Sequence, residues 1–268
     1  MTWLRLSSAV LCSLLLVSLP AFCQQIAAPA PDPQLLLQKS LAVMTGNTSL
    51  TDITLSGTAR RVAGSDDETG TVTLKASASG GMRVDFSYPS GSRSQIRTAD
   101  ADGPAGQWSG PDGAAHSIAY HNLVNDAGLA PAVTLARLLS TPNTLVTFVG
   151  QETRDGQSVV HLKTAERFSA KQPSTTKLLQ HLSEMDIFLD SSTLLPIAID
   201  FDTHPNDNAL LNIPIEIRFS DYRAVSGAQI PFHVQKYLNN GLVLDLKFES
   251  AALNSGIAPE TFQVEAGL

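Results

Sequence analysis

The chain has 268 residues, a formal net charge of −7, two cysteines, and 16% charged against 43% hydrophobic residues. No basic cluster of the kind that neutralises phosphates occurs in it, so the sequence argues against nucleic acid as a partner. Few charges beside an ordinary apolar fraction are typical of a domain with a large apolar interior. The residues that follow a short leader fit one β-rich domain.

Residues 1–23 predict a secretory signal peptide. Arg5 gives it a positive start, and the apolar run from Ala9 to Leu19 is too short to span a bilayer as a permanent helix. Cys23 allows two interpretations: cleavage after it, which starts the mature chain at Gln24, or lipid attachment to it, as in a bacterial lipoprotein. Lipid attachment sites carry a small residue before the cysteine, so the bulky Phe22 favours simple cleavage. We therefore expect a periplasmic protein whose mature chain has no transmembrane helix.

Cleavage at this position removes both Cys12 and Cys23. The mature chain then has no thiol for a disulfide, a nucleophile or a metal site. Residues 24–32, QQIAAPAPD, predict a flexible leader, and residues 33–268 a single domain without an internal boundary.

Three segments predict helices. Residues 33–45 open with Asp32 as a cap and Pro33 at the first helical position, and Leu37, Leu41 and Met44 repeat at helical spacing. Residues 131–140 predict a second, shorter helix, and residues 175–183 a third turn or two. These segments are too short to cover a large sheet.

Apolar and polar residues alternate with period two through most of the remaining chain. Successive side chains of a strand point to opposite faces, so each such run has one dry face and one wet face. The clearest runs are residues 53–57, 72–76, 82–88, 185–189, 197–201, 213–219 and 242–248, and residues 221–237 predict strand, turn and strand. Asn240-Gly241 predicts a type I′ hairpin turn. The pattern indicates about ten antiparallel strands with one solvated face.

A sheet of that size must curl or split, because its apolar face needs cover. Either it closes on itself, or it curves around the helices and leaves a cavity; both give a barrel-like body with an apolar inside. The mainly β (α+β) fold would then place these inward residues around the cavity: Leu55, Val72, Leu74, Val84, Phe86, Trp108, Ile187, Leu189, Ile199, Phe201, Ile215, Ile217, Leu244 and Leu246.

No group of residues predicts catalysis, a metal or a cofactor. His116 and His121 lie five apart without a third ligand nearby, and no HExxH, GxSxG, SxxK, P-loop or dinucleotide fingerprint occurs. The carboxylates of the later strands fall on the polar side of the alternation, where we expect solvent and not the shielded setting of a general acid: Asp186, Asp190, Asp200 and Asp202. The sequence predicts a protein that is not an enzyme.

The order of these segments resembles the LolA/LolB-like superfamily of periplasmic lipoprotein carriers. The similarity covers roughly residues 33–263 and rests on the following stretches: Gly81-Met82-Arg83-Val84-Asp85, Asp102-Gly103 ahead of Trp108, Arg137-Leu138-Leu139, Phe219-Ser-Asp-Tyr222, Ile230-Pro231-Phe232 and Leu253-Asn254-Ser-Gly256. Those carriers have an arginine beside a proline just ahead of the first stretch. Here that place reads Ala76-Ser-Ala-Ser-Gly80, which points to a divergent member.

The resemblance implies an unclosed antiparallel half-barrel with two or three short helices as lid or plug over a cavity for acyl chains. The sequence therefore predicts a non-enzymatic periplasmic binder or carrier of lipids or lipoprotein acyl chains. The alternative is a cell-envelope sensor or interaction module of the same fold, which transports no ligand and binds an envelope protein through its outer face or edge strands.

Overall fold

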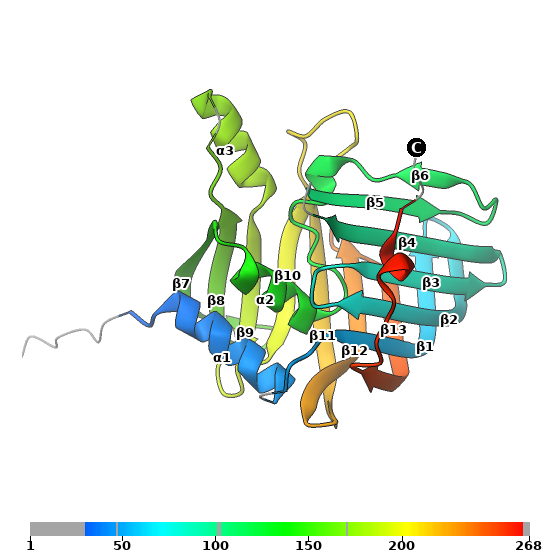
Figure 1. The fold of residues 1–268 in the computed structure, drawn as a ribbon, viewed down its shortest axis with the longest axis horizontal. Helices are drawn as coiled ribbons and strands as arrows, with labels where there is room; N and C mark the ends of the chain where they lie inside the picture. The colour runs from blue at the N-terminus through cyan, green and yellow to red at the C-terminus, as the bar shows by residue number, and fades with distance from the viewer. Residues whose placement is uncertain (1–29, 47, 101–102, 170, 265–268) are drawn as a thin grey trace, which may run out of the picture. The chain divides into compact units, whose positions relative to one another are not determined.

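The computed structural model describes residues 30–46, 48–100, 103–169 and 171–264, and strands dominate them (Figure 1). The predicted signal peptide and residues 24–29 of the predicted leader lie outside the described residues. The strands are β1 (Asp52–Ala63), β2 (Asp66–Ser77), β3 (Met82–Tyr88), β4 (Gly91–Asp100), β5 (Gly103–Ser109), β6 (Ala115–Ser117), β7 (Thr144–Arg154), β8 (Gln157–Glu166), β9 (Met185–Asp190), β10 (Pro196–Thr203), β11 (Ile213–Val225), β12 (Ala228–Leu238) and β13 (Gly241–Leu253). The helices are α1 (Pro33–Thr45), α2 (Pro131–Ser140) and α3 (Pro173–Leu182), with short 3₁₀ turns η1 (Tyr120–Asn122) and η2 (Pro259–Phe262).

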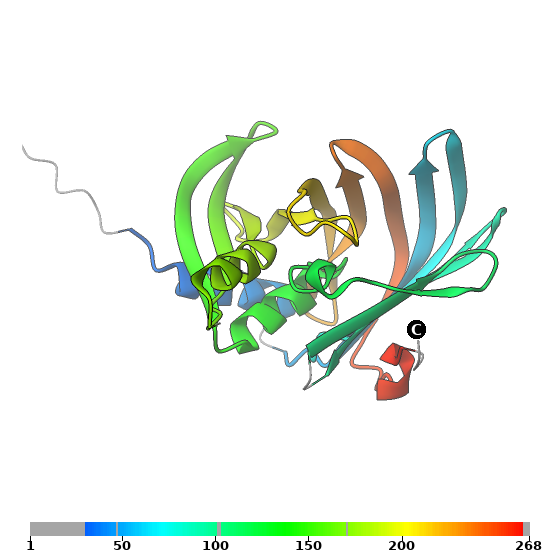
Figure 2. The same cartoon turned by 90° about the horizontal axis from the view of Figure 1, so that it is seen from above.

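All strands of the described residues join in one antiparallel sheet of order β6-β5-β4-β3-β2-β1-β13-β12-β11-β10-β9-β8-β7. β6 and β7 are the two edges, so the sheet curves without closing (Figure 2). The predicted mainly β, unclosed barrel is confirmed. The described residues hold 13 strands where about ten were expected. Polar stretches such as GSRSQIRTAD in β4 form strands without a clear alternation.

Two meanders build this sheet, one from β1 to β6 and one from β7 to β13. They are joined by the pairing of β1 with β13, which we call the seam; Ile53 faces Leu253 and Arg61 faces Leu244 across it. The register shifts beside Gly57, where a Cβ atom would lie 2.1 Å from the carbonyl oxygen of Lys247. Only glycine allows the two strands to approach this closely.

The helix ends follow from their caps. Asp32 accepts hydrogen bonds from the backbone N–H groups of Gln34 and Leu35 at 3.0 and 3.3 Å, which satisfies two donors at the start of α1. Gly46, with φ 60°, ends α1 in the left-handed conformation. The predicted bounds of α1 and α2 are confirmed, and α3 begins two residues earlier than expected because Pro173 opens it.

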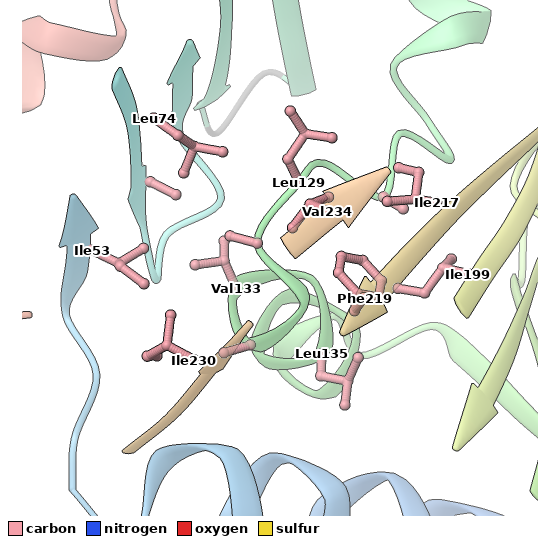
Figure 3. Packing of buried hydrophobic residues seen from close by; sticks show 14 of the residues in the cluster. Ile53, Leu74, Leu129, Val133, Leu135, Ile199, Ile217, Phe219, Ile230 and Val234 are labelled. Atoms are coloured by element: carbon pink, nitrogen blue, oxygen red, sulfur yellow. The ribbon is translucent and has the colours of Figure 1, made fainter. Parts of the chain in front are cut away.

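The core lies between the concave face of the sheet and α2. Most of α2 is buried, and Figure 3 shows Val133 and Leu135 of this helix surrounded by side chains from strands on both sides, among them Leu74, Ile217 and Ile230. Each fully buried side chain of this size contributes about 1.5–3 kcal/mol. α2 is therefore a plug inside the curve, and α1 lies against α2, β7 and β12.

The hairpin turn between β12 and β13 lies one residue earlier than predicted. Asn239 (φ 49°) and Asn240 (φ 64°) hold the positive φ angles, whereas Gly241 opens β13 opposite Leu238. Two asparagines can fill a type I′ turn because asparagine tolerates the left-handed conformation. In the part of the chain that the structure describes, no helix combines the length and apolarity needed to cross a membrane.

Candidate functional site

A cavity of about 770 Å³ opens on the concave side of the sheet, between strands of both meanders. Its apolar lining comes from β3, β10, β11 and β13 and includes Met82, Val84, Phe86, Phe201, Ile215, Ile217, Leu242 and Leu244. The volume falls within the range of about 300–1,000 Å³ that small-molecule pockets occupy. An apolar space of this kind suits a ligand with a hydrocarbon part.

The residues predicted to line a cavity fall into two groups. Seven border it: Val84, Phe86, Trp108, Phe201, Ile215, Ile217 and Leu244. The other seven face the same side of the sheet but are buried in the core, with at most 2% exposed: Leu55, Val72, Leu74, Ile187, Leu189, Ile199 and Leu246. That any of them contacts a ligand stays a prediction.

The segment between β6 and α2, residues 118–130, forms a wall of the cavity; we call it the strap. It follows no strand or helix periodicity, so sequence patterns could not predict its place. Ile118, Asn122, Asp126, Gly128 and Leu129 of the strap border the cavity. In Figure 2 the strap crosses the inside of the curve toward the loop between β10 and β11.

Hydrogen bonds fasten the strap to the end of β10. The Asn122 side chain donates to the carbonyl of His204 at 2.8 Å and accepts from the Thr203 hydroxyl and the His204 N–H at 3.0 and 2.7 Å. Asn125 donates to the carbonyl of Asp202 at 2.9 Å. These contacts satisfy backbone groups that would otherwise lack partners at the strand end.

Two arginines hold the strap from beneath. Arg97 donates to the carbonyls of Gly80 and Leu123 at 2.9 and 3.1 Å, and Arg137 of α2 donates to that of Asp126 at 3.4 Å. Burial lowers the pKa of Arg137 to about 10, and the neighbouring Arg97 adds to this shift. Both guanidinium groups remain charged at neutral pH, so their hydrogen bonds to the strap carbonyls are charge-assisted.

Polar residues also project into the apolar cavity near the β1–β2 turn. Arg61, Tyr88, Arg93 and Lys236 border it, and Asp126 of the strap is the acidic residue among the lining side chains. None of Arg61, Tyr88, Arg93 and Lys236 was among the predicted lining residues, although Arg61 continues the inward alternation of Leu55, Gly57 and Ala59, and Lys236 that of Val234. Continuing the inward alternation would have found Arg61, Tyr88 and Lys236 but not Arg93, because β4 has no apolar alternation to continue.

The carboxylates of Asp200 and Asp186 on the outer face have basic partners. Asp200 receives two hydrogen bonds from Arg154, at 2.9 and 3.0 Å, and Asp186 lies 2.7 Å from Nε2 of His161. Burial raises the pKa of Asp200 although Arg154 counteracts it. Asp190 accepts hydrogen bonds within the β9–β10 turn. These groups lie on the face opposite the cavity lining, as the alternation predicted.

Histidine rings gather where the strap meets the β10–β11 loop. His121 and His181 lie with ring centroids 6.0 and 6.2 Å from that of His204. Farther away, His116 stacks on Trp108 with centroids 4.3 Å apart. Within the described residues, no group of three or more histidine, cysteine or acidic side chains is arranged to hold a metal ion.

No protein-family model matches the chain, and no curated protein matches it in sequence. Solved structures do match its fold. A LolA superfamily protein from Nitrosomonas europaea aligns with a TM-score of 0.55 at 13% identity, over 88% of this chain and 99% of its own. A domain from Vibrio parahaemolyticus, named as a putative outer membrane lipoprotein-sorting protein domain, aligns with a TM-score of 0.54 at 11% identity. The alignment covers 86% of this chain and 97% of that domain. A DUF1329 family protein from Desulfovibrio piger aligns with a TM-score of 0.56 at 10% identity, over 87% of this chain and 98% of its own.

These alignments confirm the predicted resemblance at the level of the fold. The chain has a LolA-like fold, which it shares with these structures at 10–13% sequence identity. Fold alone does not fix function, whereas the lining of the cavity determines which ligands it can hold.

Proposed function

We propose that this protein is a non-enzymatic periplasmic carrier or binder of lipids or lipoprotein acyl chains, held in the cavity between the two meanders. The observation that carries the proposal is the apolar cavity of about 770 Å³ inside a LolA-like sheet. Each methylene transferred from water into it would contribute roughly 0.8 kcal/mol, before the loss of motional freedom on binding is subtracted. One acyl chain therefore suffices for useful affinity.

A blocking substitution tests this proposal. Leu244 of β13 borders the cavity and is half-buried, so a Trp at this position has room to extend into it. We expect Leu244→Trp to fold and to lose binding of a fluorescent fatty acid. Lys247→Trp serves as the matched control, because Lys247 lies on the same strand and is exposed; it should bind as the wild type does. Mass spectrometry of gently purified protein should also reveal bound lipid, and its absence together with no fatty-acid binding would refute the proposal.

One observation favours the alternative function. Within the described residues β7 pairs only with β8, so no strand covers its other edge, and Val149 of β7 is 53% exposed. An envelope protein could add a strand there. Crosslinking in cells that captures one stable protein partner on β7, with no lipid in the cavity, would support the sensor function over the carrier function.

A further inference from the structure

The inner face of the sheet carries basic residues in a protein whose net charge is −7. Among the side chains that line the cavity, Arg61, Arg93 and Lys236 are basic and Asp126 is acidic. Charged side chains are rarely placed in an apolar setting unless they are paired. The partners of these basic groups therefore indicate what the cavity accepts.

Arg61 and Lys236 flank the same residue of β13. In the register of the sheet, Arg61 of β1 and Lys236 of β12 both face Leu244 of β13. Arg61 is paired with two carboxylates, since its Nη1 donates to Glu68 at 3.3 Å and lies 3.9 Å from Asp66. Lys236 makes no hydrogen bond or ion pair with any described residue. Its ammonium group is thus available to a ligand.

Arg93 and Tyr88 present buried polar atoms without a partner on the facing wall. The Nε of Arg93 and the hydroxyl of Tyr88 are both shielded from water, and neither has a hydrogen-bond partner among the described residues. Tyr88 as a whole is 6% exposed, and its ring stacks on that of Phe86, which also lines the cavity. A buried donor without an acceptor destabilises a folded protein, so such donors point to a missing acceptor.

The state of Tyr88 fits a donor role. Burial raises the pKa of its hydroxyl to about 12, with Glu68 adding to the shift, while the positive charges of Arg61 and Arg93 partly counteract it. The hydroxyl therefore carries its proton at neutral pH. A hydrogen bond from it to an anion is stronger than one to a neutral group.

We propose that the ligand is an acyl chain with an anionic head group, which Arg61, Tyr88 and Arg93 bind at the cavity wall while Lys236 adds positive charge beside them. This inference rests on the proposed function and defines its ligand class. A carboxylate of a free fatty acid and a phosphate of a lipid share the chemistry that these donors recognise.

The mature chain offers its own probe for the test. Of the two tryptophans, Trp3 lies in the predicted signal peptide and Trp108 borders the cavity, so the fluorescence of the mature chain reports on the site. The ligands to compare are oleate, oleoyl-lysophosphatidylglycerol and oleyl alcohol, all below their micelle concentrations. They share one hydrocarbon chain and differ in the head group: carboxylate, phosphate diester or neutral hydroxyl.

We expect at least one anionic ligand to bind about tenfold or more tightly than oleyl alcohol, as one charged hydrogen bond accounts for such a factor. The anionic ligand that binds more tightly shows whether the site prefers the carboxylate of a fatty acid or the phosphate of a lipid. Arg93→Gln, Tyr88→Phe and Lys236→Gln should each reduce this preference while oleyl alcohol binds unchanged. The matched controls are Arg83→Gln and Lys247→Gln; the first residue pairs with Asp85 and the second is exposed. Both controls should keep the preference.

Tyr88→Phe separates a binding role from a structural role. The hydroxyl has no partner within the described residues, so its removal should leave the unfolding midpoint of the ligand-free protein unchanged or raise it. Equal binding of all three ligands to the wild type and the variants would overturn the head-group proposal and leave the carrier proposal standing. No binding of any ligand would overturn both.

Discussion

At the scale of single residues, the inner face of the sheet holds leucines in two environments. Leu189 is fully buried among core side chains, whereas Leu244 is half-buried and borders the cavity. A side chain that faces an open cavity has fewer contacts to lose when it is shortened. The same chemical change at these two positions therefore distinguishes a filled core from an open cavity.

We predict that Leu189→Ala lowers the free energy of unfolding by about 2–5 kcal/mol, the usual cost when a packed leucine is truncated. Leu244→Ala should lower it by clearly less, because part of the Leu244 side chain has no neighbour to lose. Urea denaturation of the ligand-free protein measures both values. Equal losses would mean that the cavity is filled in solution.

At the scale of elements, the strap and the β10–β11 loop meet at His204, a buried histidine. Nδ1 of His204 lies 3.2 Å from the carbonyl oxygen of Leu211, to which it donates, and its Nε2 is buried without a partner among the described residues. Burial lowers the pKa of His204 below 6.5, and His121 and His181 add to this shift while Asp202 opposes it. A second proton on Nε2 would find no acceptor.

We predict a loss of stability on acidification that depends on His204. The unfolded chain takes up the proton near pH 6.5 and the folded chain only at lower pH, so stability falls as the pH drops below about 6.5, by at most about 1.4 kcal/mol per pH unit. His204→Asn can keep the hydrogen bond to Leu211 and cannot titrate. Unfolding midpoints at pH 7.5 and 5.5 should differ less for this variant than for the wild type; an identical difference would remove His204 as the cause.

Sequence patterns located elements where local chemistry decides structure. α1 and α2 were placed correctly because Pro33 and Pro131 mark their starts, and Leu37 and Met44 repeat at helical spacing. The strand β4 was missed, because its inward residues Arg93, Gln95 and Arg97 are polar and break the alternation. Arg93 of the proposed head-group site was missed for the same reason.

The strap could not be predicted, because its position depends on contacts with residues far away in sequence. Asn122 of the strap donates a hydrogen bond to the carbonyl of His204, and Leu123 of the strap accepts one from Arg97. None of these pairs leaves a periodic signal. The division of the fourteen inward residues into cavity wall and core also depends on where the strap and α2 fill the curve, which no alternation encodes.

At the scale of the whole molecule, the seam between β1 and β13 joins two meanders into one sheet. Gly57 permits the close approach of the strands there, since a Cβ atom would lie 2.1 Å from the Lys247 carbonyl oxygen and 2.6 Å from the Cα atom of Phe248. These are backbone atoms of β13, which cannot move aside as a flexible side chain can. The seam is thus sensitive to a single methyl group.

We predict that Gly57→Ala destabilises the protein by about 1–3 kcal/mol or more, the typical cost of forcing extra volume into a tight contact. Gly150→Ala is the control, because Gly150 lies on the edge strand β7 and a Cβ there meets nothing within 4 Å. The control should be neutral or stabilise by about 0.4–1 kcal/mol, since alanine restricts the unfolded chain. Thermal unfolding of both variants provides the measurement, and equal behaviour would contradict a tight seam.

The seam also sets the order in which the molecule can fold. Hairpins within each meander join neighbouring segments and form in roughly 1–10 μs. The pairing of β1 with β13 brings together distant parts of the chain, such as Asp52 and Ser255, which are hydrogen bonded across 203 positions. Closing so long a loop is slow. Until it closes, the apolar inner faces of both meanders stay exposed to water, so the chain is most prone to aggregate in the interval in which its cavity does not yet exist.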